Sequence, residues 1–197
     1  FSKAVTQWLM GADGDYSADR RQVQGPRVRA LFRPLLRPGD PLIVKVALSP
    51  VSVEGALKNL EAEAPGWDFD ACKLQAEEAW ERKLQRIRID TPDTARKTVF
   101  YTGLYHALMA PTLACDTDRA YRGADGKTYT PPFQNHTVFS LWDTFRALHP
   151  LLTIVQPERV DGLVQSMMAF YREHGQLPVW SLWGNETSTM IGYHSAP

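Results

Sequence analysis

Two stretches of the sequence place tryptophan side chains directly beside carboxylates and amides: 139–144 and 179–187. A sugar requires this combination, because an indole covers the C–H face of the ring while fixed polar groups hydrogen-bond its hydroxyls. Gly184 would allow a tight turn from which its polar neighbours project. We therefore predict a carbohydrate-binding surface. Its candidate residues are Trp142, Asp143, Trp183, Asn185 and Glu186.

Each of these residues also has a purely structural interpretation. An aromatic beside an acid on a helix is more often core plus cap, and Asp143 could be a favourable charge at a helix terminus. Asn185 and Glu186 could cap a helix that begins near Thr187. His136 lies in a predicted loop, where it would be free to contact a ligand, so it joins the candidate sugar-binding residues.

Other chemistries fit the sequence poorly. The segment 116–118 (DTD) looks like the start of a calcium loop, but Tyr121 and Lys127 stand where an EF-hand requires Gly and Glu. The five histidines do not form an HExxH pair, and the chain has neither a phosphate-binding loop nor a GxSxG motif. Cys72 and Cys115 are interpreted as two buried free thiols, with a disulfide left open.

The composition is that of an ordinary soluble globular protein. The 197 residues include 44% hydrophobic and 22% charged residues, and 22 basic side chains balance 22 acidic ones. A neutral chain gives no reason to expect nucleic acid or an anionic membrane as a partner. No apolar run approaches the roughly 20 residues that span a bilayer.

The order of predicted elements changes character near residue 50. Before it, branched residues at 28–32 and 42–48 predict strands, and the polar segment 11–21 predicts a loop. After it, helical periodicity predicts helices over 53–64 and 69–86, the first with Ser52 as its N-cap.

From residue 91 onward the pattern is mainly helical. Pro157 predicts the start of a helix that Gly175 ends, and apolar residues favour further helices near 100–108 and 141–148. Asp125-Gly126 predicts a hairpin between short strands. The run 190–194 also looks helical, with its histidine expected in a core or supporting role.

Longer strings resemble glycoside hydrolase family 92. They are 52–70 (SVEGALKNLEAEAPGWDFD), 100–106 (FYTGLYH), 138–150 (VFSLWDTFRALHP), 156–160 (QPERV) and 184–195 (GNETSTMIGYHS). The corresponding family patterns are SVExAxxNLxxExPGWDFD, FYTxLYH, SLWDTFRxxHP, IQPERV and GNETxxMIGYHS. They occur in the right order over about 40–197, while the first 40 residues match only loosely.

The resemblance implies an α+β fragment: the end of an N-terminal β-sandwich at 1–49, a helical connector at 50–90, and the first helices of an (α/α)6 barrel at 91–197. It further implies a calcium-dependent, exo-acting, inverting α-mannosidase, often α-1,2-specific. Its partners would be mannose-containing glycans of glycoproteins. The expected location is secreted, periplasmic or at the surface of a bacterium.

The departure from the family pattern concerns catalysis. The family's acid and base lie in EGNxWQY and GNDDxGQ motifs, and these 197 residues contain neither. We therefore expect no catalytic residue within the chain, and the calcium ligands mainly outside it. Because the chain begins at Phe1 and stops just after a helix-like run, we also expect both ends to be cuts. Glu186 is placed in the substrate pocket, and Trp142 and Asp143 in its wall. The alternatives are a non-catalytic carbohydrate-binding protein and another (α/α)6 glycosidase.

Overall fold

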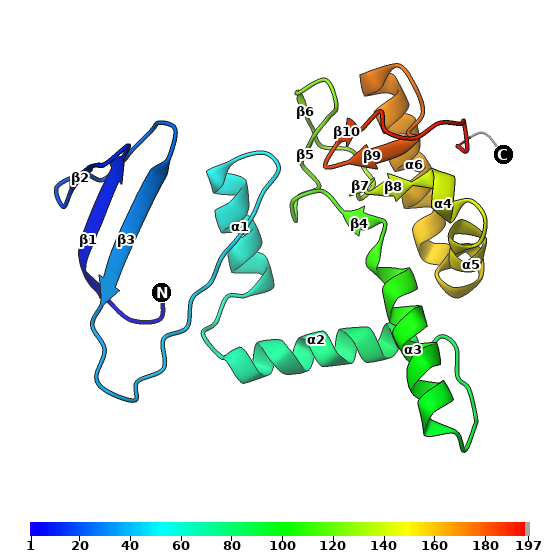
Figure 1. The fold of residues 1–197 in the computed structure, drawn as a ribbon, viewed down its shortest axis with the longest axis horizontal. Helices are drawn as coiled ribbons and strands as arrows, with labels where there is room; N and C mark the ends of the chain where they lie inside the picture. Colours follow the sequence, from blue (N-terminus) through cyan, green and yellow to red (C-terminus); the bar gives the residue numbers. More distant parts are fainter. Residues whose placement is uncertain (196–197) are drawn as a thin grey trace. The chain divides into compact units, whose positions relative to one another are not determined.

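The computed structural model describes residues 1–195, which contain six α-helices and ten short strands (Figure 1). The α+β class is thereby confirmed, while the sandwich and the barrel stay predictions. Contacts divide the chain into two compact units, 1–46 with 65–69, and 47–64 with 70–197. Each is described by itself, and the three-part division expected from the sequence stays a prediction.

The first unit contains one antiparallel sheet in the order β2-β1-β3. Strand β1 (Val5–Ala12) turns through Asp13 and Gly14, both at positive φ, into β2 (Asp15–Ser17). That hairpin replaces the loop predicted for 11–21, although its Asp-Gly pair is the usual signal for such a turn. Strand β3 (Val28–Pro34) confirms the strand predicted over 28–32.

The strand predicted over 42–48 is wrong. Its alternating pattern is real, but the segment has no ladder partner among the described residues. Ile43 hydrogen-bonds the backbone and hydroxyl of Ser2, and the Leu48 carbonyl accepts a hydrogen bond from Asn59. A strand needs a neighbour to satisfy its backbone groups, and the local pattern cannot show whether one is present.

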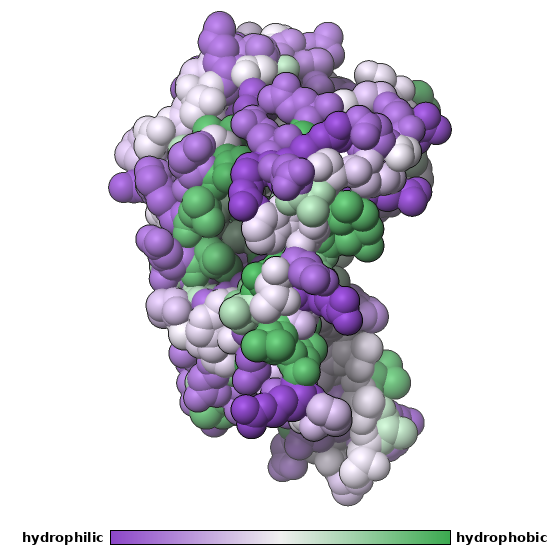
Figure 2. Space-filling model, turned by 90° about the vertical axis from the view of Figure 1, so that its left-hand side faces the viewer, coloured by the Kyte–Doolittle hydropathy of each residue, from purple (hydrophilic) through white to green (hydrophobic). Residues whose placement is uncertain are grey.

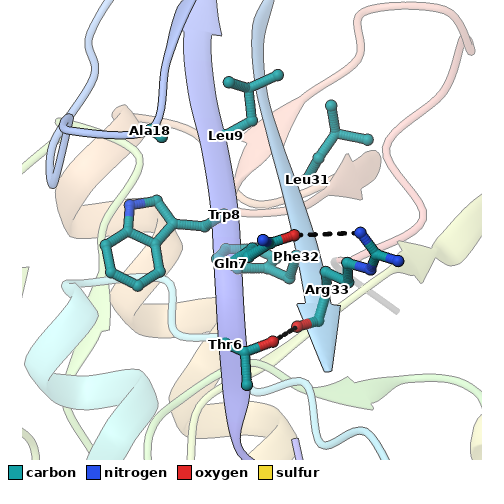
Figure 3. A pocket seen from close by; sticks show the side chains of 8 residues that line it. All are labelled: Thr6, Gln7, Trp8, Leu9, Ala18, Leu31, Phe32 and Arg33. Atoms are coloured by element: carbon teal, nitrogen blue, oxygen red, sulfur yellow. Dashed lines mark hydrogen bonds between the residues drawn. The ribbon is translucent and has the colours of Figure 1, made fainter. Parts of the chain in front are cut away.

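An open groove of about 480 Å³ lies on the β1–β3 ribbon (Figure 3). Thr6 and Gln7 each hydrogen-bond Arg33 across the strands, and Trp8 pairs with Phe32 in the ladder. The groove holds no cluster of ionisable side chains, and Phe32 remains 43% exposed. A three-stranded sheet with such apolar residues at its surface normally needs a covering layer, so we assign this groove no function.

The second unit begins with three helices. Helix α1 (Val53–Glu63) starts at Ser52, whose hydroxyl accepts the Gly55 N–H and so confirms the predicted cap. Helix α2 (Phe69–Leu84) has no buried residue, and Cys72 on it is exposed rather than buried. Helix α3 (Thr94–Met109) is capped by Asp93.

A buried carboxylate ties α1 to the segment that follows α3. Asp116 is 4% exposed and accepts hydrogen bonds from Ser49 Oγ and Asn59 Nδ2, both at 2.7 Å. A Cβ on Gly55 would lie 2.5 Å from Asp116 Oδ2, so only glycine fits there. The segment therefore forms an internal polar contact rather than a calcium loop.

The predicted hairpin at Asp125-Gly126 is confirmed as β5 (Tyr121–Arg122) and β6 (Thr128–Tyr129). Two side chains, Glu173 and Arg122, anchor this hairpin. Glu173 accepts hydrogen bonds from the Tyr121 hydroxyl and the Ala124 N–H, and Arg122 donates to the carbonyls of Pro50 and Val51.

Helices α4 (Leu141–Thr144), α5 (Leu148–Val155) and α6 (Pro157–His174) lie beside two small sheets (Figure 1). One sheet joins β4 (Thr112–Leu113) to β7 (His136–Thr137). The other has the order β10-β9-β8. Helix α6 begins with Pro157 and ends at Gly175 with φ 89°, as predicted. The core that these elements share with α3 comprises Leu104, Leu108, Phe139, Leu141, Leu152, Val155 and Leu163.

Many apolar side chains remain at the surface, including Val99, Ile154 and Val164 on helices α3, α5 and α6. Figure 2 shows such green patches among hydrophilic side chains on the face that it presents. None of the described helices combines the length and the apolarity that crossing a membrane would take.

Candidate functional site

The β10-β9-β8 sheet brings together the two tryptophan-containing stretches. Strand β8 (Phe139–Ser140) pairs with β9 (Trp180–Leu182), so that Ser140 lies opposite Trp180. Strand β9 pairs in turn with β10 (Asn185–Glu186). The Leu141 N–H also donates to the Val179 carbonyl at 3.1 Å. The stretches are far apart in the sequence, yet they form one sheet.

Trp142 and Asp143 follow β8 directly, on the short helix α4. The Ser140 hydroxyl donates to Asp143 Oδ2 at 2.6 Å, and Oδ1 of this exposed side chain has no hydrogen-bond partner among the described residues. Trp142 is 37% exposed, and the Arg146 guanidinium lies 5.9 Å from its ring. An oriented carboxylate beside an accessible indole can hydrogen-bond one hydroxyl and pack against a sugar ring.

The carboxylate of Glu186 is occupied by the backbone of its own segment. It accepts the N–H groups of Val179 at 2.9 Å, Trp180 at 3.1 Å and Thr187 at 3.0 Å. No helix begins near Thr187, so the proposed helix cap is wrong. Glu186 therefore holds the loop around β9 and β10, a function that sequence alone did not show, while its predicted contact with substrate stays a prediction.

Trp183 and Asn185 lie at the other end of β9 from Trp142. Trp183 (φ 51°) and Gly184 (φ 82°) form the two-residue turn between β9 and β10, which confirms the tight turn predicted at the glycine. Trp183 is 78% exposed at this tip. A three-residue strand spans about 10 Å, so one monosaccharide cannot be expected to contact both tryptophans.

His136 lies on strand β7, not in a loop, and is only 9% exposed. Its backbone N–H donates to Ser166 Oγ at 3.0 Å. Burial, aided by the charge of Arg159 and opposed by the Gln134 carbonyl, lowers the pKa of its imidazole to about 4. His136 is therefore neutral at pH 7, and it lines a cleft beside α2 and α6 instead of joining Trp142 and Asp143.

One contact near the site was missed from the sequence. The rings of Phe145 and His194 stack at 4.6 Å with an interplanar angle of 11°. The predicted helix over 190–194 is absent, and a Cβ on Gly192 (φ 98°) would lie 2.4 Å from His194 Nε2. The sequence holds no signal for this pair, because its two residues lie in strings that are far apart along the chain and meet only in space.

The calcium implied by the family resemblance stays a prediction for this chain. Within 1–195 there is no group of three or more His, Cys, Asp or Glu side chains placed to hold a metal ion. The Glu186 carboxylate is filled by backbone donors, and Asp143 stands with a single hydroxyl partner.

The arrangement can be compared with known proteins. The family model described as "Glycosyl hydrolase family 92 catalytic domain" matches residues 55–197. The GH92 alpha-mannosidase BT3965 from Bacteroides thetaiotaomicron superposes with a TM-score of 0.80 at 32% identity, covering 98% of this chain and 27% of its own. The inverting GH92 mannosidase BT2199 of the same organism gives a TM-score of 0.83 at 25% identity, covering 98% and 26%.

A curated relative matches over a shorter stretch. An uncharacterized secreted glycosidase from Arthroderma benhamiae is 35% identical over 72 residues, which is 34% of this chain and 9% of that protein. The chain thus spans about a quarter of the solved relatives it matches.

These matches define the class first: the sequence is related to glycoside hydrolases. More narrowly, the chain belongs to glycosyl hydrolase family 92.

Proposed function

We propose that this chain forms a sugar-binding part of an exo-acting, inverting α-mannosidase that prefers α-1,2 linkages in the mannose glycans of glycoproteins. The observation that supports the proposal is the β10-β9-β8 sheet, which places Trp142 and Asp143 beside the loop held by Glu186. Related support comes from BT3965, which has also been solved in complex with mannoimidazole.

In this proposal the chain binds and orients substrate. The Trp142 indole packs against the C–H face of a mannose ring, and Asp143 Oδ1 accepts a hydrogen bond from a hydroxyl. Trp183 and Asn185 contact the glycan farther along, at the tip of the β9–β10 hairpin. The acid that protonates the leaving oxygen and the base that activates water would come from EGNxWQY and GNDDxGQ motifs, which these 197 residues lack.

Two further parts of the proposal come from the family resemblance. Calcium would bind through residues beyond the described ones and would help to hold the sugar hydroxyls. Export from a bacterial cell fits the secreted glycosidase among the relatives, and glycoprotein glycans would then be reached outside the cell.

The first experiment is to sequence the genomic DNA past the codon for Pro197 and to express the full reading frame. We expect it to encode both carboxylate motifs and to release mannose from α-1,2-mannobiose, with the β-anomer appearing first in ¹H NMR spectra, as inversion requires. Initial release of the α-anomer would refute inversion. No release by a protein that carries both motifs would refute the mannosidase proposal.

The predicted sugar-binding residues are tested in the same protein. Trp142→Ala and Asp143→Asn should each lower kcat/KM by about 10²-fold, because each removes a contact to the sugar at the reacting centre. Trp67→Ala is the matched control, since Trp67 is similarly exposed and belongs to the other unit. Equal effects of all three changes would contradict the assignment.

A second candidate is non-catalytic carbohydrate binding. The 78% exposure of Trp183 favours it, because an exposed indole at a hairpin tip can bind a glycan without any catalytic group. A stop codon directly after Pro197, together with mannoside binding by the 197 residues, would support this alternative.

A further inference from the structure

A cleft of about 680 Å³ lies between α2 and the first half of α6. Its volume is within the range of roughly 300–1,000 Å³ that ligand pockets occupy. The lining side chains that matter here are Trp80, Lys83, His136, Glu158, Arg159 and Asp161. All of them belong to the second unit.

His136 points to a missing ligand in this cleft. Its Nδ1 is buried without a hydrogen-bond partner among the described residues, while the nearby Gln134 carbonyl raises the imidazole pKa. A Cβ on Gly162, which also lines the cleft, would lie 3.6 Å from His136 Cε1 and 3.9 Å from Nδ1. A buried polar atom left unpaired costs about 1–3 kcal/mol, so a partner at this edge of the imidazole would stabilise it.

The other lining groups define which ligand fits. Arg159 is held by Gln156 Oε1 at 2.8 Å and the Pro111 carbonyl at 2.7 Å, and a guanidinium has five N–H donors, so some remain for a ligand. Lys83 pairs with Glu158 at 3.5 Å. Asp161 forms no ion pair with another described residue.

Positive and negative groups therefore balance around the cleft. The carboxylates would repel an anion, and Lys83 and Arg159 would repel a cation. A hydroxyl can instead donate a hydrogen bond to a carboxylate and accept one from Lys83 or Arg159. A hydroxyl also suits either neutral tautomer of His136. Trp80 supplies an aromatic wall that is fixed against Tyr105, with ring centroids 4.4 Å apart.

We propose that the α2–α6 cleft binds a sugar ring, with one hydroxyl on His136 Nδ1 and the ring against Trp80. This goes beyond the mannosidase proposal, because the cleft is lined by α2, α6, β7 and neighbouring parts of α3, β4 and 132–134, and none of its lining residues belongs to the β10-β9-β8 sheet. In this proposal, the sugar contact predicted for His136 is made inside this cleft.

The test is ¹⁹F NMR on the full chain labelled with 5-fluorotryptophan, titrated with methyl α-D-mannopyranoside up to about 50 mM, because single-ring sugars bind weakly. The six tryptophans within these 197 residues report on both surfaces, and Trp80→Phe assigns the signal of the cleft. We expect a saturable shift of the Trp80 resonance.

Gly162→Ala is the decisive variant. Its methyl group makes ordinary contact with His136, so the fold is kept, and it occupies the space where the ligand hydroxyl would sit. It should weaken binding at Trp80 about tenfold. Gly103→Ala is the matched control, because Gly103 is a glycine inside helix α3 with open space around it, and it should leave the affinity unchanged.

Two results would overturn the proposal. One is a Trp80 resonance that does not move while the chain remains folded, and the other is a shift that Gly162→Ala leaves intact. Movement confined to the resonances of Trp142, Trp180 or Trp183 would refute the cleft and leave the proposed function standing.

Discussion

Glu186 offers the sharpest test of how the site is built. Its carboxylate accepts the N–H groups of Val179, Trp180 and Thr187, and hydrogen bonds to a charged acceptor contribute about 1.5–3 kcal/mol each. Water can replace part of them, because the side chain is only half-buried. We therefore expect Glu186→Ala to lower the free energy of unfolding by about 3 kcal/mol, which is well below the sum of three such bonds.

Glu186→Gln should cost about 2 kcal/mol, because one oxygen remains while the new NH₂ group faces backbone donors. Urea unfolding followed by circular dichroism measures both losses. Glu61→Gln on α1 is the control, since that exposed glutamate forms no ion pair with another described residue, and it should change stability by less than about 0.5 kcal/mol. A similarly small loss for Glu186→Gln would refute the reasoning and make the carboxylate available to a ligand.

The remaining predictions concern acid stability, packing and thiol reactivity. The pKa of His136 is about 4 in the folded chain and about 6.5 in the unfolded chain, so the unfolded state takes up the proton first as the pH falls. The free energy of unfolding should therefore decrease between pH 6.5 and pH 4, by about 3 kcal/mol in all. Urea unfolding at several pH values should show this slope, and His136→Asn should reduce it; an unchanged slope would contradict the assignment. Gly55→Ala should cost about 2 kcal/mol or more, because its Cβ would lie 2.5 Å from Asp116 Oδ2, and an unchanged thermal midpoint would mean that the neighbours move aside. A colorimetric thiol reagent should modify Cys72 well before Cys115, since Cys72 is exposed while burial raises the pKa of the Cys115 thiol; equal rates would argue against that difference.

Features with local causes could be predicted from the sequence. Ser52 starts α1, Pro157 and Gly175 delimit α6, and Asp125-Gly126 forms a hairpin, because caps and turns depend on neighbouring residues. The family strings identified the glycoside hydrolase family, which the match over 55–197 confirmed. The same strings also indicated which residues to examine for sugar binding.

Contacts between distant segments were decided only by the tertiary structure. The segment 42–48 alternates like a strand but lacks a ladder partner, and 190–194 is periodic like a helix but turns so that His194 stacks on Phe145. Pairing of β8 with β9 joined the two tryptophan-containing stretches, while His136 is buried on strand β7 instead of lying in the predicted loop. Backbone pairing and burial depend on contacts between segments that are distant in the sequence. The local pattern of residue types does not specify those contacts.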